Sequence, residues 1–392
     1  MQQISKKRCI LLNPGIITQP GRVSLRGGPL TVLWLLPLLT ASSLSAANYF
    51  IAPYGSDGNP GTSDAPFLSL QQGVNMAGPG DTVIVRDGVY GPGNAVTGGD
   101  ESGDNASAVV LVNSGAPTAW ITIKAENKWG AVLNCAMQCD SYINLYNSSY
   151  VVIQDFVIMQ GFKEGIHSND SAHHIALLGN RIEYIANRYT STTLGLSGIY
   201  TGANCHDFLI DGNVFHDIGR SDQNRLDHGM YLHGWNFTIT NNVFYNIPHG
   251  WSIQAAEGLS NVLIGNNTFA FPNAGDGQIM LWNTQSNLYI LNNIFYNPQG
   301  HAITRYESTM SNNCVIDHNL VYGAADVIAD GTGCGVGGTI GADPNFVNLQ
   351  ALDFHLQWNS PALAAGSPLA SVPRDLDGNL RPRNSWTDLG AY

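Results

Sequence analysis

Short apolar segments alternate with polar turns along most of the chain, and one asparagine recurs in the same setting. The second residue after each copy is apolar: Asn180-Arg181-Ile182, Asn213-Val214-Phe215, Asn242-Val243-Phe244, Asn267-Thr268-Phe269, Asn293-Ile294-Phe295 and Asn319-Leu320-Val321. Successive copies lie 33, 29, 25, 26 and 26 residues apart. A repeat of this length, with a turn residue and an apolar residue in fixed relation, predicts a solenoid.

The apolar segments within the repeats have the length of strands, as at residues 237–240, 262–264 and 288–291. In stacked coils each recurring Asn would lie above the next, where side-chain amides hydrogen-bond along the stack and tolerate a left-handed turn. We therefore interpret this row as architectural. The longer repeats have additional residues at 185–196 and 218–227, which predict loops on one face of the solenoid, often the binding face.

The two ends of the chain have patterns of their own. Residues 48–90 read as a strand (Asn48-Tyr49-Phe50-Ile51), a glycine-rich turn, a short helix near 68–77 and a second strand (Thr82-Val83-Ile84-Val85). This order resembles the N-terminal entry of secreted bacterial right-handed parallel β-helix proteins of the pectate-lyase-like superfamily. The stretch from Ile340-Gly341-Ala342-Asp343-Pro344 to the end resembles their closing segment.

The resemblance implies an all-β fold, a right-handed parallel β-helix (solenoid) with an N-terminal capping helix and a C-terminal capping segment over the last coil. We expect residues 48–392 to form a single domain. Within it, residues 48–90 are the N-terminal cap and first coil, 91–339 the coils, and 340–392 the C-terminal cap.

Residues 1–47 read as a signal peptide. Lys6, Lys7 and Arg8 precede an apolar core at 30–44 and three small residues at 45–47. A membrane anchor is the alternative, although the apolar run is short for a span of ~20 residues. We expect a secreted protein, extracellular or periplasmic, with no stable membrane insertion after cleavage. Removing the five basic residues of this segment changes the net charge from -12 to -17, which argues against nucleic acid as a partner.

Five cysteines follow the expected cleavage point. In an exported protein, Cys135 with Cys139 and Cys314 with Cys334 are candidate disulfides, which leaves Cys205 outside the pairs. A zinc site at these cysteines is disfavoured because no second closely spaced Cys or Cys/His pair lies nearby.

One row of polar side chains is a candidate for chemistry. Aligning the coils on the small residue that begins each first strand places Ile166, Ile199, Met230, Leu232 and Ile253 toward the core. The outward positions then form a ladder of His167, Tyr200, Tyr231, His233, Ser252 and Gln254, and His228, His249 and His301 lie just before the strands. Such a face suits carbohydrate. Trp235, Trp251 and Trp282 are equally well explained as sugar-stacking surfaces or as core and turn residues.

The positions of the basic residues narrow the choice of substrate class. Between residues 130 and 370 they are Lys163, Arg181, Arg188, Arg220, Arg225 and Arg305, and all but Arg181 lie in or beside the expected loops and row. Cations kept on one face of an acidic protein favour an anionic ligand, here a uronate-containing polysaccharide. The expected substrate-binding residues are Arg188, Arg225, Gln254, His301 and Arg305.

The reaction predicted from these residues is β-elimination, which needs a cation for the C6 carboxylate, a base for the C5 proton and an acid for the departing oxygen. Arg225 or Arg305 can supply the cation, and His228, His233 or His249 the base. Tyr231 can supply the acid, or both acid and base if a nearby cation lowers its pKa. Polysaccharide lyases on this fold often use Ca²⁺, but the row shows no compact acidic cluster, so the metal requirement stays open and no other cofactor is expected.

Three alternatives stay open at this point. Hydrolysis needs two carboxyl groups, and the nearby ones are Asp222, Asp227, Glu257, Asp276 and Glu307. A polyuronate C5-epimerase begins with the same proton abstraction as a lyase, and a non-catalytic surface protein could hold glycans on the same row. We expect the protein to act as a monomer on a polysaccharide.

Overall fold

The computed structural model describes residues 46–93, 96–97, 106–168, 171–187, 195–220, 225–271, 277–283, 285–298, 300–306, 313–324, 326–328, 333–382 and 386–392. Within the chain, Ser45–Tyr392 forms one compact unit. Residues 1–45 of the predicted signal peptide and parts of the predicted loops at 185–196 and 218–227 lie outside the described residues. In the part of the chain that is described, no helix is long and apolar enough to cross a membrane.

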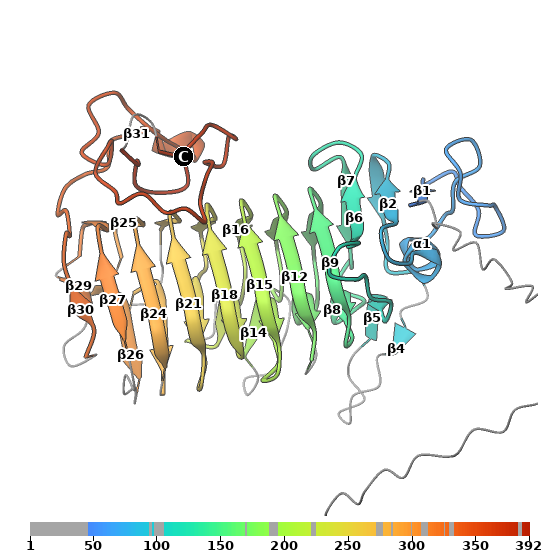
Figure 1. Cartoon of the computed structure of the whole chain (residues 1–392), viewed down its shortest axis with the longest axis horizontal. Coiled ribbons are helices and arrows are strands. Elements are labelled where there is room, and N and C mark those ends of the chain that lie inside the picture. Colours follow the sequence, from blue (N-terminus) through green and yellow to red (C-terminus); the bar gives the residue numbers. More distant parts are fainter. Residues whose placement is uncertain are drawn as a thin grey trace, which may run out of the picture. The chain divides into compact units, whose positions relative to one another are not determined.

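Most described strands belong to three sheets, here called A, B and C, and each coil adds one strand to C, then A, then B (Figure 1). Sheet A contains β1 (Asn48–Ile51), β2 (Thr82–Val85), β6 (Ile121–Ala125), β9 (Ser149–Gln154), β12 (His173–Leu178), β15 (His206–Asp211), β18 (Trp235–Thr240), β21 (Ser260–Gly265), β24 (Ser286–Leu291), β27 (Cys314–Asp317) and β30 (Gly335–Val336). Sheet B contains β3 (Gly88–Tyr90), β7 (Ala131–Asn134), β10 (Val157–Met159), β13 (Arg181–Glu183), β16 (Val214–His216), β19 (Val243–Tyr245), β22 (Thr268–Ala270), β25 (Ile294–Tyr296) and β28 (Leu320–Tyr322).

Sheet C contains β4 (Val96–Thr97), β5 (Ala106–Leu111), β8 (Ser141–Leu145), β11 (Glu164–Ser168), β14 (Leu196–Thr201), β17 (Asp227–Leu232), β20 (Ile253–Ala255), β23 (Ile279–Trp282), β26 (His301–Tyr306) and β29 (Asp326–Ile328). Apart from the β4–β5 pair, the pairings within these three sheets are parallel. This architecture confirms the predicted parallel β-helix.

The interior of the coils is a stacked apolar core. Four phenylalanines of sheet B, each two residues after a recurring Asn, stack face to face: Phe215, Phe244, Phe269 and Phe295 have neighbouring ring centroids 4.8, 4.9 and 4.9 Å apart. All four are fully buried. The ring spacing matches the ~4.8 Å distance between strands in a sheet, so each coil contributes one ring to a continuous stack.

The recurring asparagines form the predicted ladder between sheets A and B. Asn242, for example, donates from its backbone nitrogen and from Nδ2 to Oδ1 of Asn267, at 2.9 and 3.0 Å. The same pair of bonds repeats at each step from Asn180 to Asn319. The left-handed position is one residue earlier than expected, at Gly179, Gly212, Asn241, Asn266, Asn292 and His318. The ladder side chains themselves are fully buried.

The expected capping helix is α1 (Leu70–Met76), at the first coil. The Ser69 side chain caps it by accepting from the Gln72 backbone nitrogen. Leu70 and Val74 are buried. A methyl group added at Gly73 would lie 2.6 Å from Ile51 Cδ1, so a larger residue there would require the Ile51 side chain to shift.

The C-terminal segment does not lie where it was expected. Ile340 pairs with β28 of the last coil, but the chain then turns back along the outer face of sheet B (Figure 1). It includes β31 (Phe346–Asn348), a 3-10 turn at Leu349–Ala351 and β32 (Asp353–Leu356). Its apolar side chains pack with outward residues of five sheet B strands, namely Val214, Val243, Ala270, Ile294 and Leu320. The segment therefore covers the side of the solenoid rather than only closing its end.

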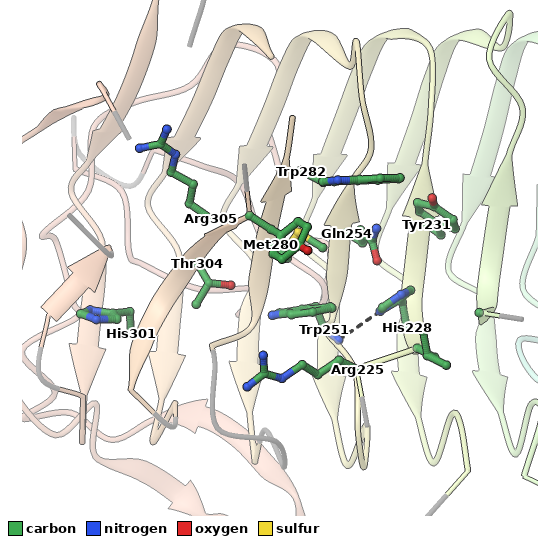
Figure 2. Close-up of a pocket in the computed structure, with 13 residues that line it drawn as sticks. Arg225, His228, Tyr231, Trp251, Gln254, Met280, Trp282, His301, Thr304 and Arg305 are labelled. Carbon is green, nitrogen blue, oxygen red and sulfur yellow. Dashed lines mark hydrogen bonds between the residues drawn. The ribbon is translucent and has the colours of Figure 1, made fainter. Parts of the chain in front are cut away.

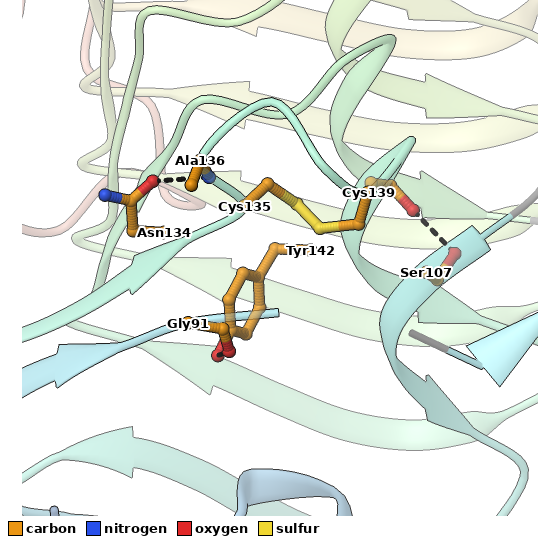
Figure 3. The surroundings of a disulfide bond; sticks show 8 residues. Gly91, Ser107, Asn134, Cys135, Ala136, Cys139 and Tyr142 are labelled. Carbon is orange, nitrogen blue, oxygen red and sulfur yellow. Dashed lines mark hydrogen bonds between the residues drawn. A yellow bond between two sulfur atoms is a disulfide. The ribbon is translucent and has the colours of Figure 1, made fainter. Parts of the chain in front are cut away.

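Both expected disulfides are present, Cys135–Cys139 and Cys314–Cys334. Figure 3 shows the first beside Tyr142, whose hydroxyl donates to the Gly91 carbonyl at 3.2 Å. Cys205 lies outside both disulfides and is buried, with its Sγ 3.3 Å from Ser168 Oγ.

Candidate functional site

The predicted outward ladder on sheet C is present and extends further than expected. Strand register aligns His167, Tyr200, Tyr231, Gln254, Met280 and Thr304 as successive partners on neighbouring strands. The residues predicted to face the core, Ile166, Ile199, Met230, Leu232 and Ile253, are fully buried. His233 follows β17, in the turn toward sheet A, and Ser252 is buried in the turn before β20.

A cavity of about 580 Å³ lies over the downstream part of this ladder. Apart from Gly195, which precedes β14, the described lining residues belong to four consecutive coils, from β17 to β26 and the turns before these strands (Figure 2). Three strand-to-strand steps of ~4.8 Å give it a length of about 14 Å along the solenoid. Six predicted residues line it: Arg225, His228, Tyr231, Gln254, His301 and Arg305.

His228 is buried at the wall of the cavity, with 3% of its surface exposed. Its Nδ1 accepts the Trp251 backbone N–H at 3.3 Å, and its ring stacks on the Trp251 ring with centroids 5.4 Å apart. Burial lowers the pKa of His228 to about 3, and a side-chain hydrogen bond with Gln254 opposes this shift. The imidazole is therefore neutral at neutral pH and is held from both sides, which suits a positioning role.

Tyr231 lies at the junction between the cavity and the upstream row. Its ring contacts His228, His233 and Tyr200, with centroids 5.7, 4.8 and 5.8 Å away. Burial raises the pKa of the Tyr231 phenol, which therefore keeps its proton at neutral pH. Burial lowers the pKa of His233, and Glu257 opposes this shift. A protonated phenol and a neutral imidazole thus lie side by side.

The cations of the central region have separate roles. Lys163 Nζ lies 3.1 Å from Asp140, Arg181 Nε lies 2.9 Å from Glu183, and the buried Arg220 pairs with Asp227 at 2.6 Å. These three are bound to carboxylates of the fold. Arg225 and Arg305 line the cavity, and Arg188 lies outside the described residues.

Two predicted residues are not part of the cavity lining. His249 precedes β20, and its backbone carbonyl accepts from the Arg225 backbone nitrogen. Its Nδ1 is buried without a hydrogen-bond partner among the described atoms. His233 lies beside the cavity, next to Tyr231.

Several lining residues were not selected as site residues from the sequence. Trp251 and Trp282 line the cavity, and Trp251 is at the same time buried, with 8% of its surface exposed. Met280, Thr304 and Tyr306 also line it. Met280 and Thr304 occupy the outward positions equivalent to Gln254. The sequence would identify both as lining residues if the strand register of the last coils could be read from it.

The donor set does not fit Ca²⁺. Among the described residues that line the cavity there is no carboxylate, whereas Ca²⁺ binds through several oxygens, mostly of Asp and Glu. Asp227 is fully buried against Arg220, with Oδ2 also accepting from the Arg220 backbone nitrogen at 2.7 Å. It therefore cannot orient a neighbouring His or act as an acid in the cavity. Asp222, Asp276 and Glu307 lie outside the described residues.

Comparison with known proteins gives the same architecture. Residues 191–345 match the model of the right handed beta helix region. The chain is 40% identical to pectate lyase PEL9 of Emericella nidulans over 60 residues, which are 15% of this chain and 14% of that enzyme.

Among solved structures, pectate lyase Pel9A superposes with a TM-score of 0.58 at 14% identity, over 89% of this chain and 97% of that one. A rhamnogalacturonan lyase gives a TM-score of 0.48 at 16% identity, over 88% and 96%. The superposition on Pel9A shows a shared fold. The chain therefore has a right-handed parallel β-helix fold, similar to that of pectate lyase Pel9A.

Proposed function

We propose that the chain is a secreted polysaccharide lyase that cleaves a uronate-containing polysaccharide by β-elimination. The observation that carries the proposal is the presence of two guanidinium groups, those of Arg225 and Arg305, in one cavity with the Tyr231 phenol. A guanidinium matches a carboxylate in charge and in geometry. Trp251 and Trp282 add flat apolar surfaces that suit sugar rings.

In the proposed reaction, Arg225 or Arg305 binds the C6 carboxylate and stabilises the negative charge that develops when the C5 proton leaves. The imidazole of His233 takes that proton, and the C5–H electrons form the C4–C5 double bond. The C4–O bond breaks, and its electron pair stays on the glycosidic oxygen. Tyr231 donates its phenolic proton to this oxygen, which completes an unsaturated uronate and a new reducing end.

The contacts support this division of roles. His233 is neutral at neutral pH because burial lowers its pKa, and a neutral imidazole is the form that accepts a proton. Its backbone is fixed by Thr201, whose Oγ1 accepts from the His233 nitrogen and donates to the His233 carbonyl, both at 2.9 Å. His228 Nδ1 accepts a hydrogen bond from the Trp251 backbone nitrogen, so we assign His228 to positioning the cavity wall. We assign Gln254 and His301 to binding substrate hydroxyls. We give His249 no direct role.

Export is part of the proposal. The two disulfides form and persist in oxidising compartments, and the charge pattern of residues 1–47 is that of a signal peptide.

The test is an assay of the purified chain on pectate, rhamnogalacturonan, alginate and neutral glycans. A lyase produces the ultraviolet absorbance of a 4,5-unsaturated uronate together with one new reducing end per cleavage. Reducing ends without this absorbance would instead assign a hydrolase. Deuterium uptake at C5 without cleavage would assign an epimerase, and saturable binding without any product would assign a carbohydrate-binding protein.

A further inference from the structure

A second group of polar side chains lies on sheet A, away from the cavity on sheet C. It consists of His173 and His174, the first residues of β12, and His206 and Asp207, the first residues of β15. The two strands are neighbours, and His173 pairs with His206 in the register. His174 and Asp207 both have left-handed backbones, with φ of 54° and 58°. This interrupts the usual alternation of strand side chains, so consecutive side chains come together.

Four donor atoms converge in this group. His173 Nδ1 lies 2.9 Å from His174 Nδ1, and His174 Nδ1 lies 3.6 Å from Asp207 Oδ2. The same carboxylate oxygen lies 2.6 Å from His206 Nδ1. One nitrogen from each imidazole lies within 4.8 Å of those of the other two. Zinc binds nitrogen at about 2.0–2.1 Å, which places two ligands of one tetrahedral ion ~3.3–3.4 Å apart, so small side-chain rotations suffice.

The surroundings hold these side chains in place. The His206 ring stacks between His173 and Trp235, with centroids 4.8 and 4.6 Å away. The Tyr150 ring lies 4.5 Å from the His174 ring. Asp207 Oδ1 accepts from Asn236 Nδ2 at 3.0 Å, so its other oxygen is directed toward the imidazoles. All four side chains keep partial solvent access, which leaves an entry path for an ion.

The fold itself does not require histidine at these positions. Two later coils carry Ser260-Asn261 and Ser286-Asn287 at the equivalent places, also with left-handed asparagines. There Asn287 Nδ2 donates to Asn261 Oδ1 at 2.8 Å. A Ser-Asn pair therefore satisfies the local backbone. The coils of β12 and β15 have His-His and His-Asp at these positions in place of Ser-Asn. Their imidazole nitrogens and carboxylate lie close enough to bind one ligand together.

We propose that His173, His174, His206 and Asp207 form a binding site for a divalent transition-metal ion of the Zn²⁺ class. Three imidazole nitrogens and one carboxylate oxygen are a donor set that Zn²⁺, Ni²⁺ and Cu²⁺ accept, whereas Ca²⁺ and Mg²⁺ prefer oxygen ligands. The ion would link two neighbouring coils, and Asn236 would support the carboxylate from outside the ligand set.

The test uses the full chain without any histidine tag. Metal content by mass spectrometry and calorimetric titration with ZnCl₂ are expected to give one saturable site per chain, and Co²⁺ is expected to give visible absorption bands of a tetrahedral complex. Replacing the pair by the Ser-Asn of other coils, in a His173→Ser/His174→Asn variant, is expected to weaken Zn²⁺ binding by more than ~100-fold, beyond the loss typical of outer-sphere partners.

The matched control is His318→Asn. His318 Nδ1 lies 3.0 Å from Asp317 Oδ2, and its φ is 51°, so it is a surface His–Asp pair at a left-handed position without the additional imidazoles. This variant is expected to bind Zn²⁺ like the wild type. A His206→Ser variant keeps the inference testable if the double variant does not fold. Absence of saturable Zn²⁺ binding, or equal binding by the wild type and folded ligand variants, would overturn it, whatever the polysaccharide assay shows.

Discussion

The ring of His233 lies tilted against the ring of Tyr231, with centroids 4.8 Å apart. The two residues come from one coil but from different environments, since Tyr231 lines the cavity and His233 lies in the turn beyond β17. Their pKa values shift in opposite directions, downward for His233 and upward for Tyr231. The proposed base and the proposed acid therefore lie side by side, each in the protonation state that its proposed role requires at neutral pH.

Replacing Tyr231 with Phe removes the proposed acid and keeps the ring that packs against His233. We expect kcat on the preferred polyuronate to fall ~10²- to 10⁴-fold, the range of general acid–base catalysis. Thermal unfolding should change little. The matched control is Tyr289→Phe, at a half-exposed tyrosine of sheet A, which should retain full activity. Full activity of Tyr231→Phe would remove the phenol from the mechanism.

The pH profile of kcat/KM follows from the same pair. His233 must be neutral, and its pKa is lowered from the ordinary 6.5, so activity should be lost only as the pH falls below that value. Tyr231 must be protonated, and its pKa is raised above 10, so the alkaline limb should lie above pH 10. His233→Ala should lower the plateau and abolish the acidic limb. An unchanged acidic limb in this variant would assign the base elsewhere.

The cations of the cavity should control affinity for the charged substrate. Hydrogen bonds to charged groups contribute about 1.5–3 kcal/mol, so Arg225→Ala or Arg305→Ala should raise KM or lower kcat/KM ~10- to 100-fold. Lys128→Ala removes an exposed charge beyond β6 and serves as the control for net charge. If Lys128→Ala has the same effect as the arginine variants, the cavity does not bind the carboxylate.

His228 should make the fold sensitive to acid. Its pKa is about 3 in the folded chain and about 6.5 when unfolded, so the unfolded state binds more protons between these values. Stability should therefore fall as the pH falls through this window, by a few kcal/mol in total. Urea unfolding at pH 4 and pH 7 checks this. His228→Asn should show a smaller difference between the two pH values, whereas His318→Asn, at a partly exposed histidine, should behave as the wild type.

The buried Asn ladder should be a major source of stability. Asn267 donates to Asn293 and accepts from Asn242, and its amide also reaches the Ile239 carbonyl. Asn267→Ala leaves several of these groups without partners, so we expect a loss of at least ~2 kcal/mol in the free energy of unfolding. Asn287→Ala breaks one bond of an exposed ladder on sheet A and should cost less than about 1 kcal/mol. Equal losses would contradict the architectural assignment.

The fold was predictable because each coil repeats the same local solution. An Asn followed by an apolar residue at a period near 26 residues specifies both the turn and the core position of Phe244 and its equivalents. The position of the C-terminal segment also has a signal in the sequence. Val243, Ile294 and Leu320 face outward beside an inward Phe or Val, and strands that are apolar on both faces must be covered.

The candidate site was predictable in part. The alternation of side chains within β17 predicts that Tyr231 faces outward. The alignment of neighbouring coils extends this prediction to Gln254, which pairs with Tyr231. The burial of His228 depends on Trp251 of the next coil, and the exclusion of Asp227 depends on Arg220, so neither follows from periodicity. The His173, His174 and His206 group depends on left-handed residues in two coils, which alternation does not anticipate.

The C-terminal segment on sheet B has a consequence for how the molecule unfolds. A solenoid in which each coil contacts only its neighbours can lose its coils one after another. Here a single segment contacts strands of five successive coils and ties to Asn241 and Asn292 through Arg381 and Ser367. Because the segment runs along the solenoid and contacts all five coils, it couples their unfolding. We therefore expect these coils to unfold in a single transition. Without residues 340–392, the same coils should unfold one after another.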